Sequence, residues 1–171
     1  NDIITVDSSL DIVLDLGGAS GGDDDVLIVA SAAVVSATGI ISFTATSATQ
    51  NNSYGAGNAT LTAANGGNRT ISVAAATGSS GAFTLVGGDG QDILTGGAGA
   101  DIITGAGAVD TIDGGGAVDT ITGGAGNDII TGGAGNDIIT VDSGTDTVTD
   151  LGGGGSGGDD DVVIVSSGAK L

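Results

Sequence analysis

The chain has no cysteine, histidine, proline, methionine or tryptophan, and its only basic residues are Arg69 and Lys170. Without cysteine and histidine it can form neither a disulfide nor the usual zinc site. The net charge of −19 repels nucleic acids and anionic membranes, which are bound through basic surfaces. No stretch is long and apolar enough to span a bilayer. We therefore expect no nucleic-acid partner and no membrane insertion.

The residues that usually perform catalysis are also scarce. An enzyme needs a group that moves protons or attacks near neutral pH, most often His, Cys, Lys or a tuned carboxylate pair. Every acidic residue here is aspartate, and Lys170 is next to the last residue. Paired aspartates could act on sugars, but a metal-binding role explains them better. We expect the chain not to be an enzyme.

What the chain does contain is a repeat of nine residues. Residues 87–140 form six consecutive nonapeptides with the plan Gly-Gly-x-Gly-x-Asp-x-U-x, where U is a large aliphatic residue. The sixth-place aspartates are Asp92, Asp101, Asp110, Asp119, Asp128 and Asp137. The eighth-place aliphatic residues are Leu94, Ile103, Ile112, Ile121, Ile130 and Ile139. A disordered linker would not place an aliphatic residue at every ninth position.

This spacing predicts a solenoid of short strands. Glycines in the first half of each nonapeptide suit a tight turn, and the β-branched second half suits a strand with one side buried. Such short strands must stack in parallel to pair their backbone groups. If successive nonapeptides form opposite walls, a coil takes two repeats, and sixth-place aspartates lie about 4.8 Å from the next coil's copy.

Aspartates at that spacing require a cation. Two charges repel by roughly 3 kcal/mol at an effective dielectric constant of 20. Two basic residues cannot neutralise 21 acids. Short carboxylates and carbonyl groups freed by glycine are the hard oxygen ligands that Ca²⁺ accepts. The sequence therefore predicts several bound calcium ions.

The pattern resembles the repeats-in-toxin (RTX) family of calcium-binding nonapeptide proteins. The resemblance implies an all-β fold, a parallel β-roll (a calcium-bound β-solenoid), in which sixth-place aspartates and turn carbonyls hold calcium and eighth-place residues fill the core. It also adds Asp146, which continues the register in Val141–Thr149. The predicted metal ligands are Asp92, Asp101, Asp110, Asp119, Asp128, Asp137, Asp146, Asp2, Asp11, Asp89, Asn127, Asn136, Gly87, Gly96, Gly123 and Gly132.

Two repeats depart from the family's pattern. They carry Ala108-Val109 and Ala117-Val118 at the fourth and fifth places. We expect these turns to bind calcium weakly or not at all, and their valines to form an apolar patch for packing unless the change is repeat decay.

The chain also contains a duplication. Residues 1–30 match residues 136–165 with an offset of 135 that becomes 136 after one inserted glycine. We interpret the chain as an excerpt or processed product of a tandem array whose period is close to this offset. Three adjacent aspartates, 23–25 and 159–161, occur in both copies and indicate either a further calcium site or solvated charge.

The segment between the copies is of another kind. Residues 31–86 contain alternating stretches such as Thr60–Ala63 and Thr70–Ala74, separated by Asn65-Gly66-Gly67-Asn68, which favours a hairpin. We predict a small β-rich, partly antiparallel insert, with residues 50–58 as an exposed contact loop. The predicted units are 1–30 (β-roll segment), 31–86 (insert), 87–149 (β-roll) and 150–171 (start of the next module).

These observations favour a structural function: a segment of a calcium-stabilised extracellular filament, surface layer or giant adhesin. Self-association, head to tail or lateral, is the expected partnership, and a cell-surface polysaccharide is a further possible partner. The resemblance implies export by bacterial type I secretion to the cell surface. One alternative is a surface- or ice-binding adhesin module that uses the ninth-place threonines Thr95, Thr104, Thr122, Thr131 and Thr140. The other is the secretion and folding domain of an exported toxin or protease.

Overall fold

The computed structural model describes residues 3–6, 10–13, 26–29, 34–40, 42–44, 50–51, 59–63, 67–76, 81–151, 159–166 and 168–171. Within these residues all regular structure is β-strand, and no helix is long and apolar enough to cross a membrane. The chain is therefore all-β, as the sequence predicts.

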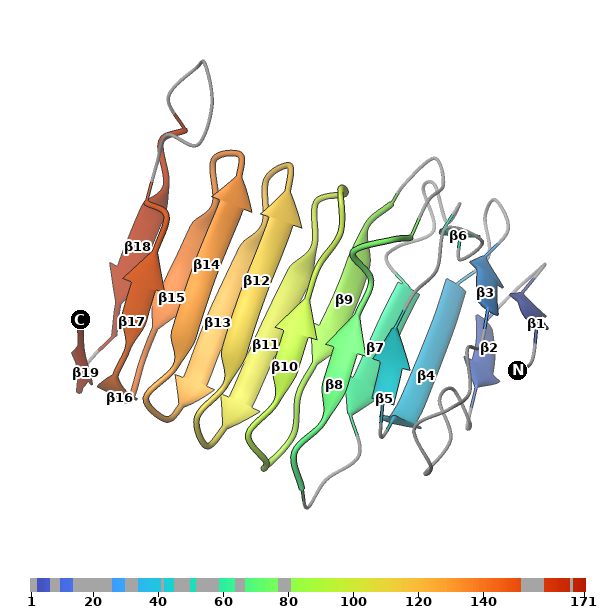
Figure 1. Cartoon of the computed structure of the whole chain (residues 1–171), viewed down its shortest axis with the longest axis horizontal. Helices are drawn as coiled ribbons and strands as arrows, with labels where there is room; N and C mark the ends of the chain where they lie inside the picture. Colours follow the sequence, from blue (N-terminus) through green and yellow to red (C-terminus); the bar gives the residue numbers. More distant parts are fainter. Residues whose placement is uncertain are drawn as a thin grey trace.

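Most strands belong to two long sheets that face each other along the molecule (Figure 1). In sheet order, the eight-stranded sheet consists of β18 (Val162–Val165), β15 (Ile138–Val141), β13 (Thr120–Ala125), β11 (Ile102–Gly107), β9 (Phe83–Val86), β7 (Ala59–Ala63), β4 (Val34–Ile40) and β2 (Leu10–Val13). The six-stranded sheet consists of β17 (Thr147–Thr149), β14 (Ile129–Ala134), β12 (Thr111–Gly116), β10 (Ile93–Thr95), β8 (Thr70–Ser72) and β5 (Ser42–Thr44).

Two small sheets lie at the ends. One contains β1 (Ile3–Val6), β3 (Val26–Val29) and β6 (Gln50–Asn51), and the other pairs β16 (Gly144–Thr145) with β19 (Ala169–Lys170). Every strand pairing found in the described residues is parallel. The structure is a parallel β-roll.

Each coil of the repeat region takes two nonapeptides, so neighbouring strands of a sheet are two repeats apart in the sequence. Ile112 of β12 pairs with Ile130 of β14, and Ile121 of β13 pairs with Ile139 of β15. The eighth-place residue of each repeat points between the sheets and is at most 1% exposed. The same core continues into the preceding coils through Phe43, Leu61, Ile71 and Leu85.

The predicted antiparallel insert is wrong in the described residues. β7 and β8 do not form a hairpin around Asn65–Asn68. β7 pairs in parallel with β4 and β9, while β8 pairs in parallel with β5 and β10 in the other sheet. An alternation of polar and apolar residues indicates one buried side of a strand, whichever direction its neighbour runs. The described strands of residues 31–86 thus belong to less regular coils of the same roll. Of the predicted contact loop, residues 50–58, only Gln50 and Asn51 are among the described residues.

The duplicated segments adopt matching strand pairs. Ile3 of β1 pairs with Val26 of β3, and their counterparts in the second copy, Ile138 and Val162, pair in the same way in β15 and β18. The duplication is therefore one of structure as well as sequence.

Candidate calcium sites

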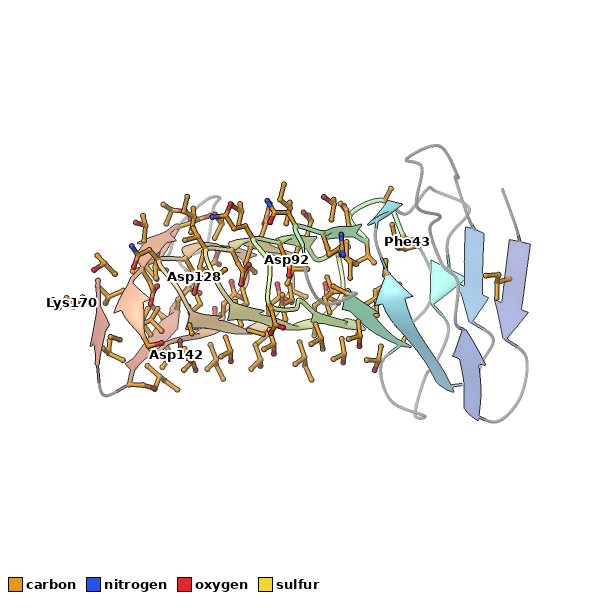
Figure 2. The ribbon with its side chains drawn as sticks, turned by 90° about the horizontal axis from the view of Figure 1, so that it is seen from below. Phe43, Asp92, Asp128, Asp142 and Lys170 are labelled. Atoms are coloured by element: carbon orange, nitrogen blue, oxygen red, sulfur yellow. The ribbon has the colours of Figure 1, made fainter. Side chains whose placement is uncertain are left out.

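Seven buried aspartates form two ladders between the sheets, and we call them the ladder aspartates. Their exposed fractions are at most 2%. They are Asp92, Asp101, Asp110, Asp119, Asp128, Asp137 and Asp146. Figure 2 labels Asp92 and Asp128, which belong to one ladder and lie between the two sheet ribbons. The position of each aspartate is set by the sixth place of its nonapeptide, where the turn ends and the strand begins.

One carboxylate oxygen of each rung is held by the backbone of the preceding coil. The backbone N–H of Asp92 donates to Oδ1 of Asp110, and that of Asp101 donates to Oδ1 of Asp119. The bond recurs along both ladders, with donor–acceptor distances of 2.7 to 3.0 Å and a separation of 18 residues. Burial of Oδ1 is therefore compensated by a hydrogen bond.

The other carboxylate oxygen has no such partner over most of the ladder. Oδ2 is buried without a hydrogen bond in Asp110, Asp119, Asp128, Asp137 and Asp146. Only in the first two ladder aspartates does Oδ2 accept a backbone N–H, from Gly88 to Asp92 and from Gly97 to Asp101, each at 2.7 Å. An anionic oxygen buried without a partner is costly, and a bound cation is the partner that this arrangement lacks.

The first-place glycines form the opposite side of each site. A Cβ added to any of them would lie 2.5 to 2.9 Å from Oδ2 of the same repeat's aspartate. At Gly87, Gly96, Gly105 and Gly114 it would also collide with the carbonyl oxygen of the first-place glycine in the next coil. Glycine is required here because carboxylate and carbonyl oxygens crowd the space of a side chain. The same crowding supplies hard oxygen ligands, which is the set that calcium prefers.

Burial changes the titration of the ladder. It raises the pKa of Asp101 to about 6, of Asp110 to about 7 and of Asp119 to about 8, against the partial opposition of the backbone hydrogen bonds. Neighbouring carboxylates of the ladder raise the pKa of Asp110 and Asp119 further. Burial likewise raises the pKa of Asp128 and Asp137. Stacked carboxylates without a cation are therefore unfavourable in the folded chain.

Carbonyl groups must complete each site. In the part of the chain that the structure describes, no three acidic side chains converge as a metal-binding group. Each turn can thus offer a ladder Oδ2 together with main-chain oxygens. These residues fit Ca²⁺, whose charge would neutralise the stacked carboxylates when bound.

The two departing repeats have strained turns. Ala108 and Ala117 occupy the fourth place with φ of 64° and 73°, in the left-handed region that disfavours a Cβ. Their valines, Val109 and Val118, are 39% and 51% exposed. They precede aspartates of opposite ladders, and their predicted use for packing against another chain or against residues 31–86 stays a prediction. Asp110 and Asp119 nevertheless keep their places in the ladders, with Oδ2 unpartnered.

The remaining predicted calcium ligands, which are neither ladder aspartates nor first-place glycines, lie in surroundings that differ from those of the ladder. Oδ1 of Asn127 accepts the backbone N–H of Thr145 at 2.8 Å, and Oδ1 of Asn136 accepts that of Asp160 at 3.2 Å. Both asparagines thus connect neighbouring coils, and a calcium-binding role for them stays a prediction. Asp89 is exposed at the third place of its repeat. Asp2 lies outside the described residues, and Asp11 is described only as a backbone position of β2.

The sequence marked Asp161 only as part of the aspartate triplet 159–161, and the structure aligns it with the ladder. Its Oδ1 accepts the backbone N–H of Asp137 at 2.8 Å across 24 residues, and its Oδ2 is buried without a partner. The signal was present in Asp161-Val162-Val163-Ile164, which has the aspartate and aliphatic spacing of a repeat. Its place in the ladder was not predicted because 24 residues separate it from Asp137, against 18 between the other rungs.

The ladder also reaches back into the coils of residues 59–86. Oδ1 of Asp92 accepts the backbone N–H of Arg69 at 2.8 Å, and Oδ1 of Asp101 accepts that of Phe83 at 2.6 Å. These coils carry Arg69 and Phe83 in place of a ladder aspartate. The carboxylate ladder therefore begins at Asp92 and Asp101 within the described residues.

Comparison with known proteins agrees with this geometry. The profile of a family described as RTX calcium-binding nonapeptide repeat (4 copies) matches residues 77–112, 86–119 and 113–148. No curated protein and no solved structure matches the chain. RTX repeats bind calcium and are typical of proteins that bacteria export by type I secretion. Over residues 77–148 the chain thus carries RTX calcium-binding repeats folded as a parallel β-roll, and its buried ladder aspartates fit calcium-binding turns.

Proposed function

We propose that this chain is a structural module of an extracellular, calcium-stabilised assembly built from tandem copies of the same roll. In this proposal calcium stabilises the folded roll, and the function of the protein is to serve as an elongated building block. Its scarcity of catalytic residue types supports a non-enzymatic role. Type I export of such repeats supports an extracellular location, where calcium is abundant.

The observation that carries this proposal is the repeated strand pair. The pairs β1 with β3 and β15 with β18 have the same pairing and nearly the same sequence, with Val163 of β18 replacing Leu27 of β3. In the first copy, β3 is covered on its other side by β6, with Ile28 opposite Gln50 and Val29 opposite Asn51. β18 is the counterpart of β3, and in the described residues its only strand partner is β15. A following module, on the same chain or on another, can cover β18 as β6 covers β3.

The open edge of β18 presents main-chain donors for that contact. Val162 N donates to Asp137 O at 2.8 Å, and Ser166 N donates to Val141 O at 2.9 Å. Since the N–H groups of a parallel strand alternate in direction, those of Val163 and Val165 point to the open edge. Uncovered strand edges of this kind pair readily with another chain. We therefore expect modules to join end to end, which yields an open fibre unless the contact closes into a ring.

The test is small-angle X-ray scattering of the chain in calcium, compared with Val165→Pro and Val165→Ala. Proline removes one edge donor and leaves the bonds to β15 intact, whereas alanine keeps the donor. We expect the maximum dimension to grow with protein concentration for the native chain and Val165→Ala, and to stay at one module for Val165→Pro. A native chain that remains one module long at every concentration in calcium would refute end-to-end assembly.

A further inference from the structure

From β7 to β18, the outer side of the eight-stranded sheet is an uncharged surface, which we call the outer face. Strand pairing aligns two straight rows on it, one from Thr60 to Val162 and one from Thr62 to Ile164, each crossing six strands. Every residue in both rows is threonine, valine or isoleucine. Ile102, Ile138, Val162 and Ile164 are 39–53% exposed. The face is thus regular, β-branched and partly apolar.

The corresponding face of the six-stranded sheet differs. From β8 to β17 its two rows contain only two aliphatic residues, Ile93 and Ile129, and they include the exposed carboxylate of Asp113. Its last strand presents Thr147 and Thr149, where β18 presents Val162 and Ile164. The side-chain hydroxyl groups of Thr131 and Thr149 also form a hydrogen bond with each other, at 2.9 Å. The face of the six-stranded sheet is therefore more polar than the outer face and is better suited to remain exposed to solvent.

Charge narrows the choice of partner for the outer face. In a chain of net charge −19, most contacts between copies bring like charges together. The outer face avoids that repulsion, because no charged side chain lies in its rows. A sugar ligand would usually be held by aromatic and charged side chains, and the rows contain neither. A second outer face of the same kind matches it in both charge and spacing.

We propose that the outer face pairs with the outer face of a second copy of this chain, so that two rolls lie back to back. This inference rests on the proposed structural function and specifies the lateral surface of the assembly. Six strands about 4.8 Å apart and four to six residues long span roughly 25 Å by 13–20 Å. Such an area is at or below the low end of specific interfaces, so one module pairs weakly. Modules joined in series reinforce the contact by avidity.

The experiment compares Thr120→Asp with Thr111→Asp in calcium. Both threonines are exposed, both directly follow a ladder aspartate, and both are flanked in their row by two isoleucines. They differ in the sheet: Thr120 lies in the outer face and Thr111 in the opposite face. Circular dichroism first establishes that both variants fold in calcium. Ile164→Asp, with Thr149→Asp as its control, serves as a second pair if the first does not fold.

The readout is the mass per unit length obtained from small-angle scattering, which end-to-end joining does not change. We expect this mass per length to double with protein concentration for the native chain and for Thr111→Asp, and to remain at the single-roll value for Thr120→Asp. An equal response of the two variants would overturn the proposed face. Long particles that keep the single-roll value would overturn lateral pairing and leave the proposed function standing, whereas single modules in calcium would contradict both.

Discussion

At the scale of the residue, the two oxygens of a ladder aspartate have separate tasks. Oδ1 accepts a backbone hydrogen bond from the preceding coil, and Oδ2 is available to bind a cation. In Asp119, for example, Oδ1 accepts the N–H of Asp101 at 2.7 Å while Oδ2 is buried without a partner. We therefore expect the same carboxylate to stabilise the roll in calcium and to destabilise it without calcium.

Asp119→Asn separates these two effects. The amide can keep the bond through Oδ1, but it removes the charge and the Oδ2 ligand. In calcium we expect the free energy of unfolding to fall, by about 2.7 kcal/mol if one site is lost at a calcium concentration of 100 times its Kd. Without calcium we expect the variant to be more stable than the native chain, because a repelling buried charge is gone. Chemical denaturation under both conditions measures this.

Asp113→Asn is the matched control, since Asp113 carries the same charge at an exposed position of the six-stranded sheet. We expect it to change stability little under either condition. A loss of stability for Asp119→Asn both with and without calcium would contradict the assignment of Oδ2 to the metal.

At the scale of the strand and turn, the first-place glycines couple one coil to the next. Their lack of a side chain makes room for the aspartate Oδ2 and for a carbonyl oxygen of the neighbouring coil. Glycines in the same strand differ sharply in the space that is available for a Cβ. A Cβ on Gly114 would lie 2.5 Å from Oδ2 of Asp119, whereas a Cβ on Gly116 would meet its nearest atom at 3.8 Å.

We therefore predict opposite tolerances for Gly114→Ala and Gly116→Ala. Gly114→Ala forces the site open and should lower the free energy of unfolding by about 1–3 kcal/mol, together with the calcium affinity. Gly116→Ala should leave calcium affinity unchanged. Isothermal titration calorimetry and thermal unfolding in calcium provide the comparison. Equal calcium affinities for the two variants would show that the space beside Gly114 does not form the site.

At the scale of the whole molecule, we expect folding to depend jointly on protons and calcium. The ladder pKa values in the fold, about 6 to 8 for Asp101, Asp110 and Asp119, lie above the usual value of 3.8 for aspartate. A raised pKa means that the calcium-free fold binds more protons than the unfolded chain does. Its stability is therefore present at acid pH and is lost as the pH rises through the folded pKa values.

This predicts that the calcium-stripped chain has most β-structure near pH 4–5 and progressively less up to pH 8, while calcium restores the fold at pH 8. Circular dichroism across this range, with and without calcium, tests it. Sodium chloride at pH 8 is the control, because salt screens surface charges much more than buried ones. If salt alone restored the fold as fully as acid does, surface repulsion and not the ladder would govern folding.

The repeat region could be predicted from sequence in considerable detail because its information is local and periodic. A nine-residue period with aspartate at the sixth place and an aliphatic residue at the eighth specifies turn, strand, core and ladder at once. The two-repeat register of Ile112 with Ile130 follows from it, as does the burial of Asp146.

Tertiary structure decided what this period does not encode. Alternation in Thr60–Ala63 and Thr70–Ser72 indicates strands but not the direction of their partners, and both proved to be parallel members of the roll. Asp161 joins the ladder across 24 residues because pairing with β15 aligns it beneath Asp137, whatever the length of the intervening chain. The contrast between the outer face and the exposed face of the six-stranded sheet likewise depends on which strands stack in one sheet. By itself, the sequence determined a calcium-binding roll, because turn, strand and ligand recur within nine residues. Only stacking decided the ladder's extent and the uncharged face, because both are made of contacts between coils.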